Sequence, residues 1–170
     1  PEWYSITGKL KCTKERNRII PDIIKVCDDK FFILDAKYYN INMEVDNDNI
    51  SINGNPNSYD VIKQFAYQLA FENLKDDNYL KKRNLSEKDK NIRVIRQCSE
   101  IINAFLFPKY MKNVYEIFAS VKLDVFNLKP ILSIYLSSNI IFDMYINNKR
   151  FSNVQLQDFA IKCHDSLENL

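Results

Sequence analysis

Two apolar runs flank a short polar segment in the first quarter of the chain. Residues 19–26 and 31–39 are rich in Ile, Val, Phe and Tyr, which favour strands, and Asp28 and Asp29 lie between them. Aspartate tolerates the left-handed backbone that short hairpin turns require. The pattern therefore predicts an antiparallel hairpin with Asp28 and Asp29 at its turn.

Apolar residues at helical spacing follow a polar stretch. Asn57 or Ser58 is a suitable N-cap, and an acidic residue at position 60 suits the first helical turn. The apolar stripe that predicts the buried face of this helix consists of Val61, Ile62, Phe65, Ala66, Leu69 and Ala70. Opposite the stripe lie Asp60, Lys63, Gln64, Tyr67 and Phe71. A polar edge of the helix can therefore turn toward a site.

The remainder of the chain alternates between strand and helix patterns. Strands are expected at 3–11, 101–107, 114–126 and 131–136. A short helix capped by Ser138, a final helix from Ser152, a loop at 40–57 and a charged connection at 76–91 are also expected. Gln155, three residues after Ser152, completes a capping-box spacing. This mixture predicts an α/β or α+β fold with one central mixed β-sheet flanked by helices.

Composition narrows the classes of protein that fit the pattern. The 170 residues suit one domain, and the presence of only two glycines excludes a Gly-rich phosphate loop of the nucleotide-binding type. The four cysteines form no C-x-x-C pair, and we expect the single histidine, His164, at the surface, so neither zinc nor disulfides are expected. We expect a cytoplasmic protein with reduced thiols and no membrane contact. Pro1, in place of an initiating Met, leads us to expect that residues 1–170 are a domain of a longer chain.

The net charge is only +2, but basic residues gather in one stretch. The stretch consists of Lys81, Lys82, Arg83, Lys88, Lys90, Arg93 and Arg96. A run of this kind is usually a solvated face, and contact with DNA phosphates is the alternative. Under that alternative, Lys81, Lys82 and Arg83 are DNA-binding residues.

The predicted hairpin brings two carboxylates and an amine together. With the turn centred on the two aspartates, Asp22 faces Asp35, and Lys37 shares the face of Asp35 because side chains two residues apart point to the same side. Facing positions put Cβ atoms about 4.5–5.5 Å apart, where like charges repel. A divalent cation, a shared proton or the Lys37 ammonium would offset this repulsion. A one-residue bulge would instead put the carboxylates on opposite faces.

Converging aspartates suit a hard cation. Mg²⁺ prefers carboxylate oxygens and keeps several waters, so Asp22 and Asp35 are candidate metal ligands. A lysine beside the metal can orient the attacking water or stabilise charge on a phosphate under attack. The residues therefore predict a Mg²⁺ site, in which Mn²⁺ can substitute, with Lys37 as a catalytic residue.

Three strings of residues carry a resemblance to a known family. They are Ile20-Pro21-Asp22-Ile23-Ile24, Ile33-Leu34-Asp35-Ala36-Lys37-Tyr38-Tyr39 and Asp60-Val61-Ile62-Lys63-Gln64-Phe65-Ala66-Tyr67. Over about residues 17–72 they resemble the PD-(D/E)xK restriction endonucleases, and among these the LlaJI-like and McrC-like nuclease subunits. The resemblance implies a restriction-endonuclease-like core and Mg²⁺-dependent cleavage of DNA.

Carried over position by position, the resemblance implies a role for each matching residue. Asp22 and Asp35 would ligate the metal, and the Ala36 carbonyl would add a further oxygen. Lys37 would serve the attacking water. Gln64 matches a glutamine that many relatives place beside the active site.

Two further positions to consider are Lys63 and the upstream glutamate of the family pattern. Lys63 is a candidate for contact with DNA phosphate, with a solvated side chain as the alternative interpretation. Many relatives also use a glutamate on an upstream helix, for which Glu2 and Glu15 are the only candidates. The absence of a clear counterpart puts a second metal ion in doubt.

The expected function is that of a metal-dependent endodeoxyribonuclease of a type II-like restriction system, acting on double-stranded DNA. The resemblance also suggests a nucleotide-hydrolysing restriction subunit as a partner, and a homodimer is a further expectation. Two rivals stay open. One is a non-catalytic, nuclease-like module for DNA binding or assembly, and the other is a PD-(D/E)xK nuclease of DNA repair or recombination.

Overall fold

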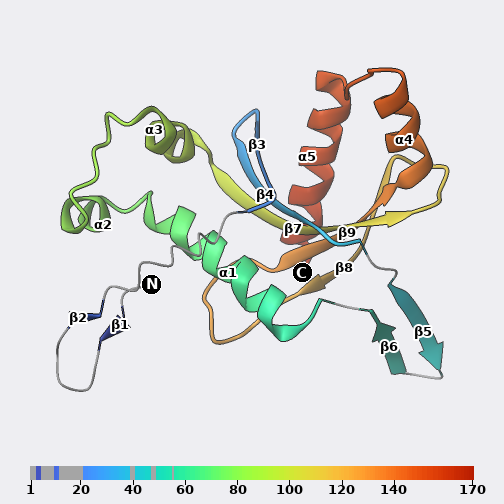
Figure 1. Cartoon of the computed structure of the whole chain (residues 1–170), viewed down its shortest axis with the longest axis horizontal. Helices are drawn as coiled ribbons and strands as arrows, with labels where there is room; N and C mark the ends of the chain where they lie inside the picture. Colours follow the sequence, from blue (N-terminus) through green and yellow to red (C-terminus); the bar gives the residue numbers. More distant parts are fainter. Residues whose placement is uncertain (1–2, 5–9, 12–20, 39–40, 47–48, 55) are drawn as a thin grey trace.

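A computed structural model of the chain contains one mixed five-stranded sheet, in the order β3-β4-β7-β9-β8 (Figure 1). The strands are β3 (Ile23–Cys27), β4 (Lys30–Ala36), β7 (Glu100–Lys109), β8 (Tyr115–Val121) and β9 (Ile131–Ser137). The three central strands are parallel, and β3 and β8 pair antiparallel at the edges. The structure describes the whole chain except residues 1–2, 5–9, 12–20, 39–40, 47–48 and 55.

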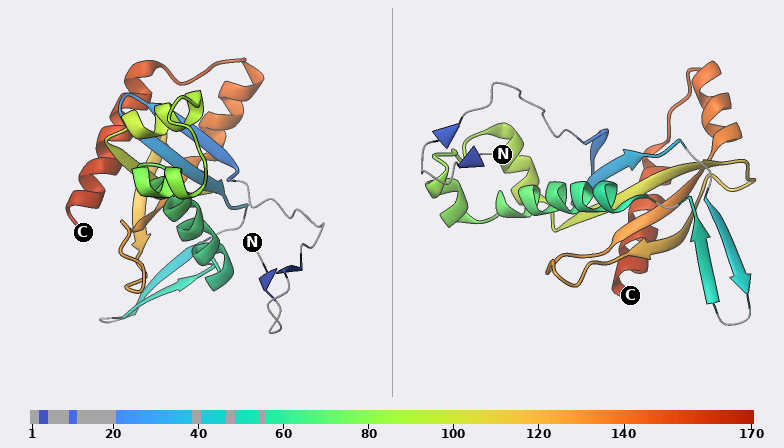
Figure 2. Two further views of the ribbon diagram at one scale, coloured as in Figure 1. Left: turned by 90° about the vertical axis from the view of Figure 1, so that its left-hand side faces the viewer. Right: turned by 60° about the horizontal axis from the view of Figure 1, so that its bottom comes forward.

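Helices cover both faces of this sheet (Figures 1 and 2). The helices are α1 (Ser58–Asn73), α2 (Asp77–Lys82), α3 (Lys90–Gln97), α4 (Ser138–Ile146) and α5 (Asn153–Glu168). Phe65 of α1 packs against Phe105 and Phe107 of β7, whereas Cys163 of α5 packs against Ile102 on the opposite face. Alternate residues of each central strand therefore face α1 and α5. Among the described residues, no helix is long and apolar enough to cross a membrane.

The β3–β4 hairpin and the N-caps of α1 and α5 are as the sequence predicts. Ile24 of β3 pairs with Ile33 of β4, and Asp28 at the turn has a φ of 52°. Asn57 caps α1, and Ser152 forms a complete capping box at the start of α5. The mixed sheet flanked by helices confirms the expected fold class, in its α+β form.

Several segments differ from prediction. Residues 40–57, expected as a loop, contain the antiparallel hairpin of β5 (Asn42–Asp46) and β6 (Asn49–Asn53), which the sequence pattern misses because its Asn and Asp residues disfavour strands. The expected charged connection contains α2 and the start of α3, each with an Asp N-cap. The segment 3–11 contains two two-residue strands, β1 (Trp3–Tyr4) and β2 (Leu10–Lys11). Smaller shifts are that β8 ends at Val121, β7 continues through Pro108 and Ser137 caps α4.

The buried face of α1 is rotated from the predicted apolar stripe. Ile62 and Leu69 are 52% and 42% exposed, whereas Gln64 and Gln68 are buried. The Gln64 amide donates to backbone carbonyls of β4 and β7. Asn103 Nδ2 of β7 donates to the Gln64 backbone carbonyl and to Gln68 Oε1, both at 3.0 Å. Buried polar groups require such partners. A polar layer therefore lies between α1 and the sheet, directly beneath the candidate site.

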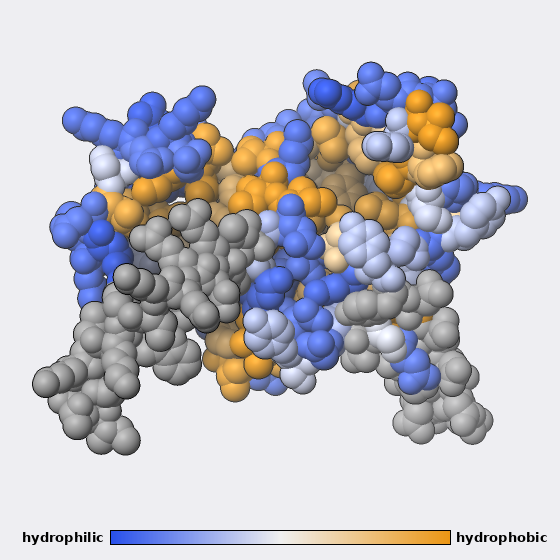
Figure 3. Space-filling view, viewed as in Figure 1, coloured by the Kyte–Doolittle hydropathy of each residue, from blue (hydrophilic) through white to orange (hydrophobic). Residues whose placement is uncertain are grey.

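The outer edge of the hairpin is only partly covered. Figure 3 shows apolar residues gathered over β3 and β4, between the more polar surfaces of the flanking helices. Ile23 and Ile24 of the edge strand β3 are about half exposed. A groove of about 470 Å³ is lined by Ile23, by Phe151, which precedes α5, and by Leu156 of α5.

Candidate active site

The open end of the hairpin positions the two predicted carboxylates. Strand pairing extends to Ile23 opposite Leu34, so Asp22 directly precedes the ladder at the position opposite Asp35. The Ala36 N–H donates a hydrogen bond to Asp22 Oδ2 at 3.1 Å. Asp22 is exposed, whereas Asp35 is only 2% exposed. The two carboxylates therefore lie at the same end of the strand pair, and one faces solvent whereas the other is buried.

The Lys37 ammonium lies between two carboxylates. Its Nζ is 2.7 Å from Asp35 Oδ2 and 2.7 Å from Oδ1 of Asp60, which belongs to the first turn of α1. The contact with Asp60 is a hydrogen bond, and the contact with the buried Asp35 carboxylate is an ion pair. The structure thus brings Lys37 to Asp35, as strand alternation predicts, and adds Asp60 as a third member.

These carboxylates keep Lys37 charged. Burial disfavours the ammonium form, but the close contacts and the negative charges of Asp35 and Asp60 outweigh burial, so the pKa of Lys37 lies above its ordinary value. Lys37 is therefore a hydrogen-bond donor and a fixed positive charge at neutral pH. A general base would need the opposite shift of its pKa.

The polar edge of α1 supplies a second cation. Lys63 Nζ lies 3.6 Å from Asp35 Oδ1 and 5.5 Å from the centre of the Tyr67 ring. Burial lowers the pKa of Lys63, but its hydrogen bond to Tyr67 and the charge of Asp35 raise the pKa by more, so the net shift is upward. Burial raises the pKa of the Tyr67 hydroxyl, Lys63 opposes this, and the charges of Asp35 and Asp22 add to the rise. Both aspartates therefore lie within electrostatic reach of the same side chain of α1.

Gln64 lies beneath the site, not at its surface. Its side chain is 1% exposed, and Nε2 donates to the backbone carbonyls of Ile33 at 3.3 Å and Ala104 at 3.5 Å. Gln64 Oε1 is buried and accepts no hydrogen bond. The predicted polar edge of α1 thus holds for Lys63, whereas Gln64 contacts the backbones of β4 and β7 two residues before Asp35.

The predicted basic segment is not brought to the carboxylates. Lys81, Lys82 and Arg83 are exposed at the end of α2, beyond the C-terminal end of α1 (Figure 1). Asp60 lies at the other end of α1, which spans about 24 Å at 1.5 Å per residue. Glu2 and Glu15, the candidates for an upstream glutamate, lie outside the described residues.

The donor set around Asp35 fits a hard divalent cation. Buried carboxylate oxygens normally have a hydrogen-bond donor or a cation as a partner, and among the described residues the partner of Asp35 Oδ2 is the Lys37 ammonium at 2.7 Å. The exposed Asp22 carboxylate is beside the same strand. The N–H and C=O of one strand residue point to the same side, so the Ala36 carbonyl also faces the Asp22 side of β4. Carboxylate and carbonyl oxygens are the ligands that Mg²⁺ takes from proteins.

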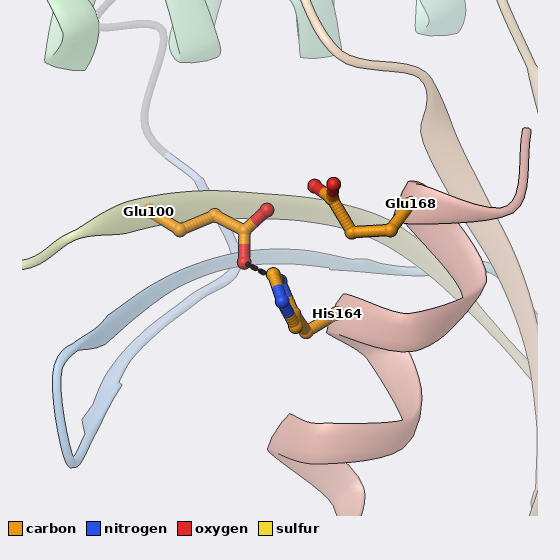
Figure 4. Close-up of side chains that lie close together, drawn as sticks. All are labelled: Glu100, His164 and Glu168. Atoms are coloured by element: carbon orange, nitrogen blue, oxygen red, sulfur yellow. Dashed lines mark hydrogen bonds and ion pairs between the residues drawn. The ribbon is translucent and has the colours of Figure 1, made fainter.

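A second group of charged residues is built differently. Glu100, His164 and Glu168 form the one cluster of three potential metal-ligating side chains in the part of the chain that the structure describes (Figure 4). Lys129 Nζ donates hydrogen bonds to both glutamates, and His164 Nδ1 lies 2.8 Å from Glu100 Oε2. The ammonium groups of Lys129 and of Lys30, which lies 3.8 Å from Glu100, therefore already balance the two carboxylates. His164, expected at the surface, is instead half-buried against Glu100.

Asp60 is the site residue whose role sequence reasoning missed. Its acidic side chain was assigned only to the first turn of α1, where the positive helix end favours it. The signal for a further role was its position on the polar edge of the helix, one turn before Gln64. Only the packing of α1 against β4 identifies its partner as Lys37.

Two comparisons with known proteins identify similar sequences. The sequence model of the LlaJI restriction endonuclease family matches residues 1–139. The chain is also similar to the type II restriction enzyme BsuMI component YdjA of Bacillus subtilis (strain 168), with 32% identity over 171 residues. That match covers 98% of this chain and 31% of YdjA, so the chain spans about a third of the length of this relative. No solved structure matches the chain.

Proposed function

This chain belongs to the LlaJI restriction endonuclease family, and on that basis we propose that it carries the metal-dependent DNA-cleaving centre of a restriction endonuclease of the PD-(D/E)xK type. The observation that carries the proposal is the buried carboxylate of Asp35, in contact with the Lys37 ammonium at 2.7 Å. A buried acid costs free energy unless it is paired, so sites of this kind are often functional.

Each residue of the site has a distinct proposed role. Asp22, Asp35 and the Ala36 carbonyl hold Mg²⁺, or Mn²⁺ in its place. The bound cation would polarise the phosphodiester and stabilise the leaving oxygen. Lys37 orients the attacking water and stabilises negative charge on the phosphate as a hydrogen-bond donor, in line with its raised pKa. Gln64 is a positioning residue that braces the backbone of β4 before Asp35.

The substrate and the partners follow from the family. We propose double-stranded DNA as the substrate, with Lys63 as a phosphate contact beside the site and Lys81, Lys82 and Arg83 as more distant contacts. YdjA is named as a component of a restriction enzyme, which supports assembly with other subunits. A nucleotide-hydrolysing restriction subunit and a second copy of this chain are the proposed partners.

The direct test is DNA cleavage by Asp35→Asn, an exchange that removes the charge and keeps the shape. With Mg²⁺ or Mn²⁺, and with a partner subunit present where cleavage needs one, we expect cleavage to fall at least about 100-fold. Asp143→Asn is the matched control because it removes an exposed aspartate on α4. Circular dichroism and thermal unfolding establish that both variants fold.

The same experiment separates the rival functions. A chain that binds DNA but never cleaves it, with or without Asp35, would be a non-catalytic module. Cleavage of closed circular DNA indicates an endonuclease of a restriction system. Activity confined to DNA ends or junctions would instead indicate a nuclease of repair or recombination.

A further inference from the structure

Lys37 has two acidic partners that differ in burial. Its ammonium donates a hydrogen bond to Asp60 Oδ1 at 2.7 Å. It lies equally close to Asp35 Oδ2, and the contacts with both acids raise its pKa. The Asp60 side chain is 19% exposed, whereas that of Asp35 is 3% exposed. Asp60 is therefore the more exposed of the two acidic partners of Lys37.

The charges around Asp35 are almost balanced without a metal ion. Asp22, Asp35 and Asp60 carry three negative charges, and Lys37 and Lys63 carry two positive ones. A divalent cation that approaches Asp35 meets the Lys37 ammonium at the same carboxylate oxygen. The two cations repel each other strongly in surroundings of low dielectric constant. Binding of the metal therefore requires another place for the ammonium.

We propose that Asp60 is a positioning residue that takes over the Lys37 ammonium when a divalent cation binds Asp35, and that it thereby sets the metal affinity of the site. This inference rests on the proposed function, because it concerns the same metal site. The ammonium needs no large movement, since its hydrogen bond to Asp60 is already formed. Asp60 comes from α1 and Lys37 from the end of β4, so helix packing places the acceptor beside the lysine.

A simpler role for Asp60 makes a different prediction. Asp60 is the third residue of α1, where a negative charge stabilises the positive helix end. If that were its whole role, Asp60→Asn would lower the stability of the fold but leave the metal affinity of folded molecules unchanged. Its charge could also attract the metal through space, and that effect would be the same with or without Lys37.

The experiment is a double-mutant cycle on Mn²⁺ binding, measured by electron paramagnetic resonance on the 170-residue chain without DNA. We expect Asp60→Asn to weaken Mn²⁺ binding about tenfold, and Asp60→Glu to recover most of the loss. In a Lys37→Met background, where the Lys37 ammonium no longer competes, we expect Asp60→Asn to change the affinity less than about twofold. Asp143→Asn is the charge control.

Each outcome decides between these roles. Equal weakening by Asp60→Asn with and without Lys37 overturns the transfer of the ammonium and leaves attraction through space. Unchanged affinity in Asp60→Asn, while Asp35→Asn abolishes binding, overturns this inference but keeps the proposed function. No Mn²⁺ binding by the unaltered chain, or binding that survives Asp35→Asn, overturns both. Variants are compared at a temperature at which circular dichroism shows them folded.

Discussion

The carboxylate of Asp35 and the ammonium of Lys37 lie 2.7 Å apart on the face of the sheet that α1 covers. The last acidic residue of β4 and the residue that directly follows the strand thus form an ion pair whose acidic member is almost completely buried. Removal of one partner from a buried pair leaves an uncompensated charge, which is more costly than loss of the pair as a whole. The same contact therefore contributes to stability and to the proposed chemistry.

Lys37→Met tests the contribution of this pair to stability. We expect the free energy of unfolding to fall by about 3 kcal/mol, because Asp35 keeps its charge and retains only Lys63 at 3.6 Å. The double variant Asp35→Asn/Lys37→Met should recover most of that loss. Urea unfolding of both variants at neutral pH measures the difference. A double variant no more stable than Lys37→Met would contradict the pairing.

Asn103→Ala tests the polar layer beneath the site. Asn103 Nδ2 donates to the Gln64 carbonyl and to Gln68 Oε1, both of them buried. Loss of the donor leaves buried Gln68 Oε1 without this hydrogen bond, whereas the Gln64 carbonyl keeps its partner within the helix, so we expect a destabilisation of about 1–3 kcal/mol in urea unfolding. Asn91→Ala, at an exposed position of α3, is the control and should change stability by less than about 0.5 kcal/mol.

Glu100→Gln tests a pH-dependent contribution at the other end of β7. Burial raises the pKa of Glu100, but hydrogen bonds from Lys129 and His164 outweigh it and hold the pKa below its ordinary value of 4.5. Lys30 lies 3.8 Å from the same carboxylate, and Glu168 shares Lys129. A carboxyl with a lowered pKa in the folded state stabilises the fold above its ordinary pKa, and this contribution is lost as the pH falls through the folded-state value.

The expected result follows from that sign. Glu100→Gln should be less stable than the unaltered chain at about pH 7, and the difference should shrink as the pH falls below about 4.5 toward about pH 3. Urea unfolding over this pH range gives the measurement. A difference that stays constant across the range would mean that the charge of Glu100 contributes nothing to stability.

Lys81→Ala/Lys82→Ala tests the distant basic segment. If both lysines bind DNA phosphates, the slope of log affinity against log salt concentration should decrease by about 0.9 for each phosphate that is no longer neutralised. Lys122→Ala/Lys162→Ala, which removes two lysines elsewhere on the surface of the chain, should leave the slope unchanged. Fluorescence anisotropy with a short duplex measures both variants. An unchanged slope in Lys81→Ala/Lys82→Ala would identify the segment as a solvated face.

Features that depend only on neighbouring residues can be predicted from the amino-acid sequence. The pairing of Ile24 with Ile33 follows from a turn of two residues, and Asp28 takes the left-handed backbone that this turn needs. Asn57 and Ser152 cap their helices through hydrogen bonds to residues three positions away. Local geometry was sufficient to put Lys37 on the face of Asp35, because side chains alternate along a strand.

Features that join distant parts of the chain depend on how the helices and strands pack together. The rotation of α1 about its axis buries Gln64 and brings Asp60 to Lys37, and it depends on what the helix packs against. The apolar stripe predicts the wrong rotation, because hydrogen bonds offset the burial of two side-chain amides. The Gln64 amide donates to backbone carbonyls of β4 and β7, and Asn103 of β7 donates to Gln68 Oε1. Glu100 likewise finds its partner His164 64 residues further along the chain. Such contacts depend on how helices and strands are arranged in space, which the periodicity of a single segment does not specify.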